Sequence, residues 1–142
     1  MGKTLKTFMV VTDVGFLIYW LITWLHLVPK EYLYKNYDNE LMVAWNVSFV
    51  PLDLLISCTG LLSMYFFRRN KGLWQPLCII SLTLTFCSGL QAIAFWAIQM
   101  DLDWFWWIPN LFLMIYPLFF LPGIMKFGGE NDERKDHSSL GG

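Results

Sequence analysis

Four long apolar segments, separated by short polar stretches, account for most of the chain. Each has at least the ~20 residues that an α-helix needs to cross the hydrocarbon core of a bilayer. Backbone groups in lipid must be satisfied within the segment itself, so we expect each segment to be helical. The pattern predicts an all-α fold: an antiparallel four-helix transmembrane bundle that forms a single domain over residues 1–127. The predicted spans are residues 8–28, 41–67, 73–99 and 104–127.

The basic residues are distributed unevenly between the two sides of such a bundle. With four spans, the N-terminus, the middle loop and the C-terminus lie on one side. Most of the ten Lys and Arg residues belong to this side: Lys3, Lys6, Arg68, Arg69, Lys71, Lys126, Arg134 and Lys135. The positive-inside rule therefore predicts a multi-pass protein of the cytoplasmic membrane with both termini in the cytoplasm. We expect residues 128–142, which are polar and charged, to form a disordered cytoplasmic tail.

The composition agrees with a membrane protein and narrows the possible functions. Apolar residues make up 56% of the chain and charged residues 15%, with a net charge of −1. A nucleic-acid interface needs a clustered basic surface, and none is present, so we expect no nucleic-acid partner. The sequence also lacks a phosphate-binding loop, a Ser/His/Asp set and Cys/His spacing typical of metal sites. We therefore expect no catalytic residue, no metal and no cofactor, and favour a protein that is not an enzyme.

The second span carries an acidic residue near its middle. On a helical wheel, Asn46, Asp53, Ser57 and Gly60 lie on one narrow face, whereas the other faces are mostly aliphatic. Pro51 removes a backbone hydrogen bond two residues before the acid and favours a kink there. An ionisable residue at this depth is costly in lipid and is typical of a functional site. The alternative is a protonated Asp53 that only bonds to a neighbouring helix.

Other polar and aromatic residues lie at a depth where they can surround Asp53. Gln91 in the third span and Asn110 in the fourth are predicted to orient a ligand, together with Asn46. Tryptophan rings can supply apolar and cation–π walls. Asp13, nearer the cytoplasmic end of the first span, is a second candidate polar site, for a proton or a cation. The favoured alternative is an Asp that bonds to Thr12 or to a neighbouring helix, or that reaches the cytoplasmic interface. The predicted ligand-binding set is Asp53, Asn46, Gln91, Asn110, Trp20, Trp45 and Trp96.

The loop of residues 29–40 contains three tyrosines, Tyr32, Tyr34 and Tyr37. Tyrosine is typical of the aromatic belt at a membrane surface, because its ring is apolar and its hydroxyl is polar. Under a functional interpretation, the same loop covers the outer mouth of the bundle as a lid.

These patterns leave three functional hypotheses open. The first is a protein that binds a lipid or a hydrophobic amine in an intramembrane cavity around Asp53. The second is an accessory or oligomeric membrane subunit, in which stripes of small residues pack against another copy or another membrane protein. The third is a small proton-coupled transporter. In each case membrane lipids surround the helices.

Four stretches of the chain carry a resemblance to a known family. They are VTDVGFLIYWLITWLHLVPKEYL, AWNVSFVPLDLLISCTGLLS, LTFCSGLQAIAFWAIQ and WWIPNLFLMIYPLFFLPG. In these the chain resembles the YvaD-like family, small four-span membrane proteins of Bacillus and relatives with no assigned function. The resemblance covers nearly all of the chain from Leu5 to Lys126. It implies a bacterial cytoplasmic membrane protein and supplies no catalytic residue.

A more distant resemblance in layout is to the EXPERA group, which includes the emopamil-binding protein and the sigma-2 receptor. It is based on four helices with both ends cytoplasmic, the segment PKEYLY after the first span, the acid Asp53, and IPNLFLMIYPLFF in the fourth span. The resemblance implies an acidic, aromatic-lined cavity for sterols and amphipathic amines. The group's other acids have no counterpart here, because Asp13 is too close to the cytoplasmic end, so sterol isomerase chemistry is not implied.

Overall fold

The structure, a computed structural model, describes residues 1–29, 32 and 38–139, with side chains described as far as residue 126. These residues form α-helices joined by short turns, as the apolar pattern predicts. Four stretches are long and apolar enough to cross a membrane: Lys3–Trp24, Glu40–Arg68, Trp74–Ile98 and Trp104–Lys126. The helices are α1 (Lys3–Trp24), α2 (Glu40–Val47), α3 (Val50–Arg68), α4 (Trp74–Ile98) and α5 (Trp104–Ser139).

The first helix is displaced toward the N-terminus relative to its predicted span. It begins at Lys3 and ends at Trp24, whereas the apolar pattern predicts residues 8–28. The end is set by local backbone geometry, because His26 has a φ of 53° and the Leu27 amide bonds back to the Ile22 carbonyl. This left-handed cap satisfies carbonyls that a helix end leaves free.

The last helix continues beyond the span predicted from hydropathy. The sequence predicts a disordered tail from residue 128, but α5 runs without interruption to Ser139. Hydropathy marks only the end of the apolar stretch. The residues that follow Gly129 include Glu, Arg and Lys, which favour a helix, and no proline comes after Pro122. The final residues of the predicted tail, 140–142, lie outside the described part.

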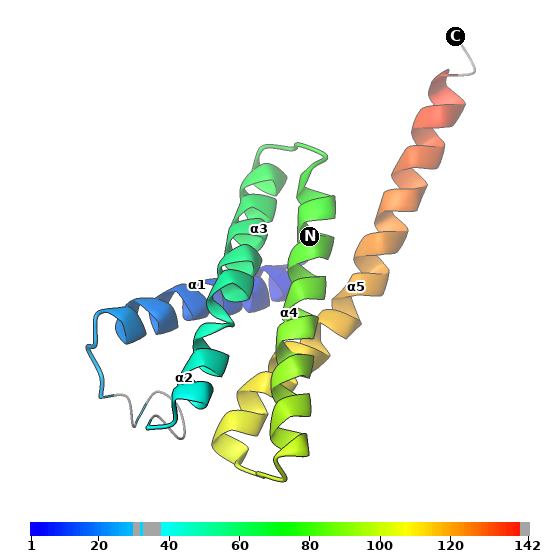
Figure 1. The fold of residues 1–142 in the computed structure, drawn as a ribbon. Helices are drawn as coiled ribbons and strands as arrows, with labels where there is room; N and C mark the ends of the chain where they lie inside the picture. Colours follow the sequence, from blue (N-terminus) through cyan, green and yellow to red (C-terminus); the bar gives the residue numbers. More distant parts are fainter. Residues whose placement is uncertain (30–31, 33–37, 140–142) are drawn as a thin grey trace.

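The helices pack in the order α1, α3, α4, α5. The most extensive contacts are between α4 and α5, between α3 and α4, and between α1 and α3. Figure 1 shows α3 and α4 side by side and antiparallel, with α1 crossing α3 obliquely and the end of α5 extending away from the other helices. A Cβ atom on Gly89 of α4 would lie 2.6 Å from the Asn110 carbonyl oxygen of α5, so α4 and α5 meet there backbone to backbone. The bundle is therefore tight between these two helices.

The buried core is small and lies where the N-terminal half of α1 meets α4 and α5. Around it, the ring of Phe8 makes edge contacts with Phe112, Tyr116 and Phe120 of α5. The residues of this core are Leu5, Met9, Cys78, Leu82 and Tyr116.

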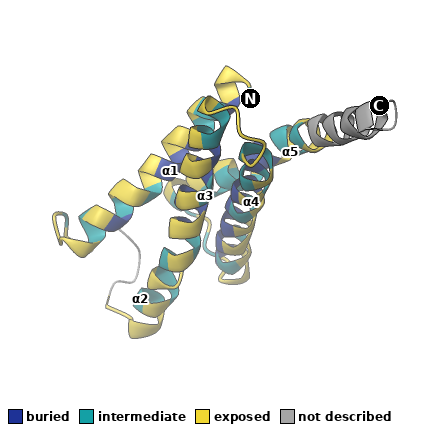
Figure 2. Cartoon of the chain, turned by 90° about the horizontal axis from the view of Figure 1, so that it is seen from above, coloured by how far each residue is buried: buried dark blue, intermediate teal, exposed yellow. Residues whose placement is uncertain are grey.

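Large apolar side chains cover the outside of every helix. Figure 2 shows that exposed residues follow the outward faces along the whole length of the bundle. Ile98 and Phe119, for example, are 81% and 78% exposed. Contiguous apolar surface of this extent is atypical of soluble monomers. Together with the length of the four helices, it indicates a membrane protein.

Candidate functional site

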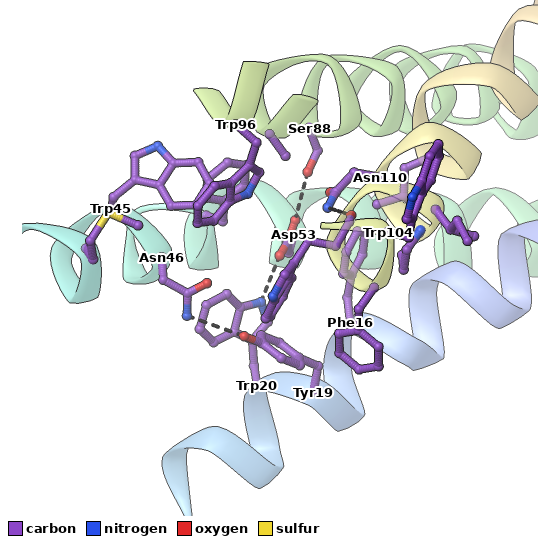
Figure 3. Close-up of a pocket in the computed structure, with 18 of the residues that line it drawn as sticks. Phe16, Tyr19, Trp20, Trp45, Asn46, Asp53, Ser88, Trp96, Trp104 and Asn110 are labelled. Carbon is purple, nitrogen blue, oxygen red and sulfur yellow. Dashed lines mark hydrogen bonds between the residues drawn. The ribbon is translucent and has the colours of Figure 1, made fainter. Parts of the chain in front are cut away.

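A cavity of about 640 Å³ lies where α2, the start of α3 and the start of α5 meet the C-terminal halves of α1 and α4. Figure 3 shows Asp53 between the tryptophans and asparagines that surround it. The residues that line the cavity are Phe16, Tyr19, Trp20, Tyr32, Met42, Trp45, Asn46, Phe49, Asp53, Ser88, Ala92, Trp96, Trp104, Phe105, Trp106, Ile108, Pro109, Asn110 and Leu113.

Asp53 lies in the first turn of α3, immediately after a break in the second span. α2 ends at Val47 and α3 begins at Val50, with Pro51 in the first turn of the new helix. Proline has no N–H, so the Val47 carbonyl loses its usual partner at this point. The kink predicted from Pro51 is confirmed. It places the carboxyl group at the N-terminal end of a helix, where the helix dipole favours negative charge.

Two side chains from neighbouring helices hold the Asp53 carboxyl group. Trp20 of α1 donates from Nε1 to Oδ2 at 2.9 Å, and Ser88 of α4 lies with Oγ 3.4 Å from Oδ1. Asp53 is only 4% exposed. A helix on either side of α3 is thus connected to the same carboxyl group, with both donors drawn in Figure 3.

Aromatic rings form the outer wall of the cavity. Trp45 of α2 stacks on Phe95 of α4, with ring centroids 4.0 Å apart, and meets Trp96 edge to face at 5.8 Å. One residue before the end of α2, Asn46 donates from Nδ2 to the Tyr19 hydroxyl oxygen at 3.4 Å. This wall offers ring faces and few polar atoms to an occupant.

Six of the seven residues predicted for the site line this cavity. They come from all of the helices and from distant parts of the sequence, which is what a shared pocket requires. Asn110 uses its amide nitrogen within α5, where it donates to the Trp106 carbonyl at 2.7 Å. The six are Asp53, Asn46, Asn110, Trp20, Trp45 and Trp96.

Gln91 is a correction to the predicted set. Its side chain is exposed and does not line the cavity, although the sequence places it within about one turn of the depth of Asp53. Depth alone does not determine which way a helical residue points. Ser88 and Ala92 lie about 40° apart on the buried face of α4, whereas Gln91 is turned about 100° from Ala92, on the side away from that face.

The residues that sequence reasoning missed are mainly Ser88, Tyr19 and Phe16. Ser88 belongs to a stripe of small residues, Ser81, Thr85, Ser88 and Ala92, which is buried along α4. That stripe indicated close helix packing, and its outermost serine is the one that reaches Asp53. Tyr19 and Phe16 carried no signal, because aromatic residues are common throughout the chain.

The loop tyrosines are only partly described. Tyr32 lines the cavity, as a lid residue would. Tyr34 and Tyr37 lie outside the described residues, so their part in the predicted lid or belt stays a prediction.

Asp13, the second polar site, lies away from the cavity at the contact between α1 and α3. It is 1% exposed, and its carboxyl group packs directly against Gly60. Ser57 of α3 donates to its backbone carbonyl at 3.0 Å. The two acids of the interface therefore have different surroundings, one at a cavity and one in a closed contact.

The chemistry available at the cavity is that of one acid in an apolar chamber. In the part of the chain that the structure describes, no three His, Cys, Asp or Glu side chains gather as a metal site would require. A single carboxyl group with two hydrogen-bond donors can pair with a cation or accept a further donor. No second titratable group lines the described cavity at a position suited to acid–base partnership with Asp53, apart from the tyrosine hydroxyls.

Comparisons with known proteins give the family of the chain. Residues 5–131 match a family of unknown function, DUF5360. Uncharacterized protein YvaD of Bacillus subtilis (strain 168) is 49% identical over 126 residues, which cover 89% of this chain and 95% of that protein. No solved structure matches significantly. The likeness to the EXPERA group remains one of layout, which these comparisons do not support. With the match spanning all four long helices, the chain belongs to the DUF5360 family, to which its YvaD-like sequence pattern pointed.

Proposed function

We propose that this chain is a multi-pass protein of the cytoplasmic membrane that binds a lipid or a hydrophobic amine in the cavity around Asp53. The observation that carries the proposal is a buried acid at the edge of a largely aromatic cavity of about 640 Å³. Pockets for small molecules are commonly 300–1,000 Å³, mostly apolar, with few polar groups that fix orientation. Asp53 supplies that polar group here.

The distribution of charge supports an orientation with both termini in the cytoplasm. The start of α1 and the end of α3 lie together, because Lys6 Nζ is 4.3 Å from the centroid of the Phe67 ring. The start of α4 joins them through the bond from Ser63 Oγ to the Trp74 carbonyl at 2.7 Å. The basic N-terminus and the basic middle loop are thus at one end of the bundle, and the cavity is toward the other. By the positive-inside rule, the cavity lies in the outer half of the membrane.

The chemistry of the lining favours a cation attached to an apolar body. A positively charged amine can pair with the Asp53 carboxylate, while the faces of Trp45 and Trp96 attract its charge at short range. A neutral lipid makes only the apolar contacts, and it can accept a hydrogen bond from protonated Asp53. We therefore rank an amine above a neutral lipid as the occupant.

The small residues that the sequence offers for packing against a second protein make contacts within this chain. Ser81 and Thr85 of α4 are buried. The space beside Gly60 is occupied by α1, and the space beside Gly89 is occupied by α5. This weakens the alternative of an accessory or oligomeric subunit that assembles through these stripes. It leaves the lipid-facing surfaces of the helices as the surfaces open to a partner.

The experiment is mass spectrometry of the molecules that co-purify with the wild-type protein and with Asp53→Asn. It is combined with binding of N,N-dimethyldodecylamine and of dodecanol, which shares its alkyl chain but has no amine. We expect the amine to bind more tightly than the alcohol, and Asp53→Asn to weaken amine binding about tenfold.

Asp38→Asn is the matched control, because Asp38 is exposed before α2 and away from the cavity lining. It should leave amine binding unchanged. Equal affinity of the amine for wild type and Asp53→Asn, with the same bulk lipids in both preparations, would refute the proposal.

A further inference from the structure

The contact between α1 and α3 has a regular register. Three pairs of residues meet across it, each seven residues from the next on both helices, and the helices run antiparallel. A spacing of seven residues returns to nearly the same face of a helix, so the pairs form one continuous seam. Starting from the N-terminus of α1, the pairs are Lys6 with Phe67, Asp13 with Gly60, and Trp20 with Asp53.

The middle pair of this seam encloses the Asp13 carboxyl group. Asp13 is 1% exposed, and a Cβ atom on Gly60 would overlap its carboxyl oxygens. Its Oδ2 has no hydrogen-bond partner among the residues that the structure describes, and neither has the hydroxyl of adjacent Thr12. By contrast, Ser57 satisfies the backbone carbonyl of Asp13. Within Asp13, Oδ2 is the oxygen left without a donor in the described structure.

The groups that face this carboxyl group supply no positive charge. On α4 the titratable neighbour is the Cys78 thiol, and on α5 it is the Tyr116 hydroxyl. α3 contributes Ser57 and Gly60, neither of which titrates, and its acid Asp53 is about 10 Å farther along the helix. The cations at this end of the bundle include Lys6, two turns away on α1 over the Phe67 ring, and the Met1 ammonium, whose charged neighbours are Lys6 and Cys78. Among the described side chains, none can form an ion pair with Asp13.

We propose that Asp13 is a proton-binding site, separate from the cavity, at which one proton is bound at neutral pH. An ionised carboxylate in this position would have neither water, nor a cation, nor a donor for Oδ2, which is the most costly way to bury a charge. Binding forms one O–H bond on the carboxyl group and removes that charge. The proton comes from water and returns to it only when α1 separates from Gly60, because the closed seam excludes solvent.

The site does not depend on any ligand in the cavity. It shares the seam with the Trp20–Asp53 hydrogen bond, so a movement of α1 that opens one contact disturbs the other. Proton release at Asp13 is therefore tied to the same helix movement that exposes Asp53.

The test is infrared spectroscopy of the full-length protein in lipid nanodiscs at neutral pH, comparing wild type with Asp13→Asn. We expect the variant to lose the C=O stretch of a protonated carboxylic acid. That band should lie at the high-frequency end of its range, because Oδ2 accepts no hydrogen bond. Asp53→Asn should retain it. Loss of a carboxylate stretch instead would overturn the proposal.

A second variant keeps the test decisive if Asp13→Asn does not fold. Gly60→Ala leaves Asp13 in the chain but pushes its carboxyl group out of position, so the acid band should shift or broaden. Gly15→Ala is the control, because a Cβ at Gly15 meets nothing within 4 Å. An acid band that is identical in Gly60→Ala and wild type would overturn the assignment. Failure of amine binding at Asp53 would leave this result unchanged, so the two proposals fail independently.

Discussion

The two acids of the α1–α3 seam occupy opposite kinds of environment. Asp53 lies at a cavity, at the start of a helix, and receives hydrogen bonds from Trp20 and Ser88. Asp13 lies two helical turns away along the seam, in a closed contact with Gly60 and with Oδ2 unpartnered in the described structure. The surroundings of Asp53 therefore suit ligand binding, whereas those of Asp13 suit a neutral, protonated carboxyl group.

The difference arises from what stands opposite each acid. A large indole faces Asp53 and contributes a donor, while the helix break before α3 opens space beside it. A glycine faces Asp13, so the helices close over it and no space is left. Open surroundings with donors suit recognition, whereas close packing without donors suits a group that carries a proton. The following changes test this contrast, beginning with the largest expected effect.

Replacing Gly60 by leucine should destabilise the protein most. The new side chain must occupy the volume of the Asp13 carboxyl group, so α1 is forced away from α3. Overpacking of this kind costs about 3 kcal/mol in a tight contact. Thermal unfolding in detergent, followed by circular dichroism, measures this loss of stability.

The control for that substitution is Gly15→Leu, at an exposed glycine of α1, the partner helix of the seam. We expect a change within about 0.5 kcal/mol, as for most surface substitutions. Equal unfolding midpoints for the two leucine variants would mean that the seam is not closed at Gly60.

Replacing Trp20 by phenylalanine should have the next largest effect. It removes the donor to Asp53 Oδ2 and leaves a buried carboxyl group with only the longer contact to Ser88. We expect a loss of about 1.5 kcal/mol, the lower range for a hydrogen bond to a charged group.

Trp24→Phe is the matched control, since Trp24 is one turn farther along α1 and 83% exposed. A double-mutant cycle of Trp20→Phe with Asp53→Leu should give an interaction energy of similar size. An interaction energy near zero would show that the bond contributes nothing to holding α1.

Much of this architecture follows from the apolar pattern. Spans long enough for a bilayer predict the long helices, and Pro51 beside Asp53 predicts the break between α2 and α3, because these signals lie within single segments. The predicted first span extends a few residues beyond the end of α1, because hydropathy carries no information on the left-handed backbone conformation at His26.

The surroundings of the two acids depend on how helices meet, which a single segment does not reveal. Depth along the helices predicts Gln91 near Asp53, but the face of α4 that packs on α3 carries Ser88 instead. Likewise, Gly60 was visible on the polar face of its helix, yet its position opposite Asp13 requires the antiparallel register of the seam. Pairing across helices was the missing information.

Replacing Ser57 of the seam, or Ser88 of α4 beside Asp53, by alanine should have a smaller effect on stability. Ser57→Ala removes a 3.0 Å bond to the Asp13 backbone carbonyl, and hydrogen bonds between membrane helices contribute about 0.6 kcal/mol on average. Ser88→Ala should cost less, because its contact with Asp53 is longer, at 3.4 Å. Titration with N,N-dimethyldodecylamine should distinguish the two variants further, because we expect only Ser88→Ala to alter the affinity for this amine. A larger stability loss for Ser88→Ala would reverse the expected contrast.

The smallest effect is expected for Asp13→Asn on binding of N,N-dimethyldodecylamine. The amide has nearly the same shape as the protonated acid and does not line the cavity, so affinity should change less than about twofold, or within about 0.4 kcal/mol. Asp53→Asn, measured by the same titration, should weaken binding about tenfold, because the charge partner of the amine is lost. If Asp13→Asn weakens binding as strongly, then the two acids act as one site, and the separation of a recognition acid from a proton-carrying acid fails. If only Asp53→Asn has an effect, the contrast between an open and a closed acid on one helix seam stands.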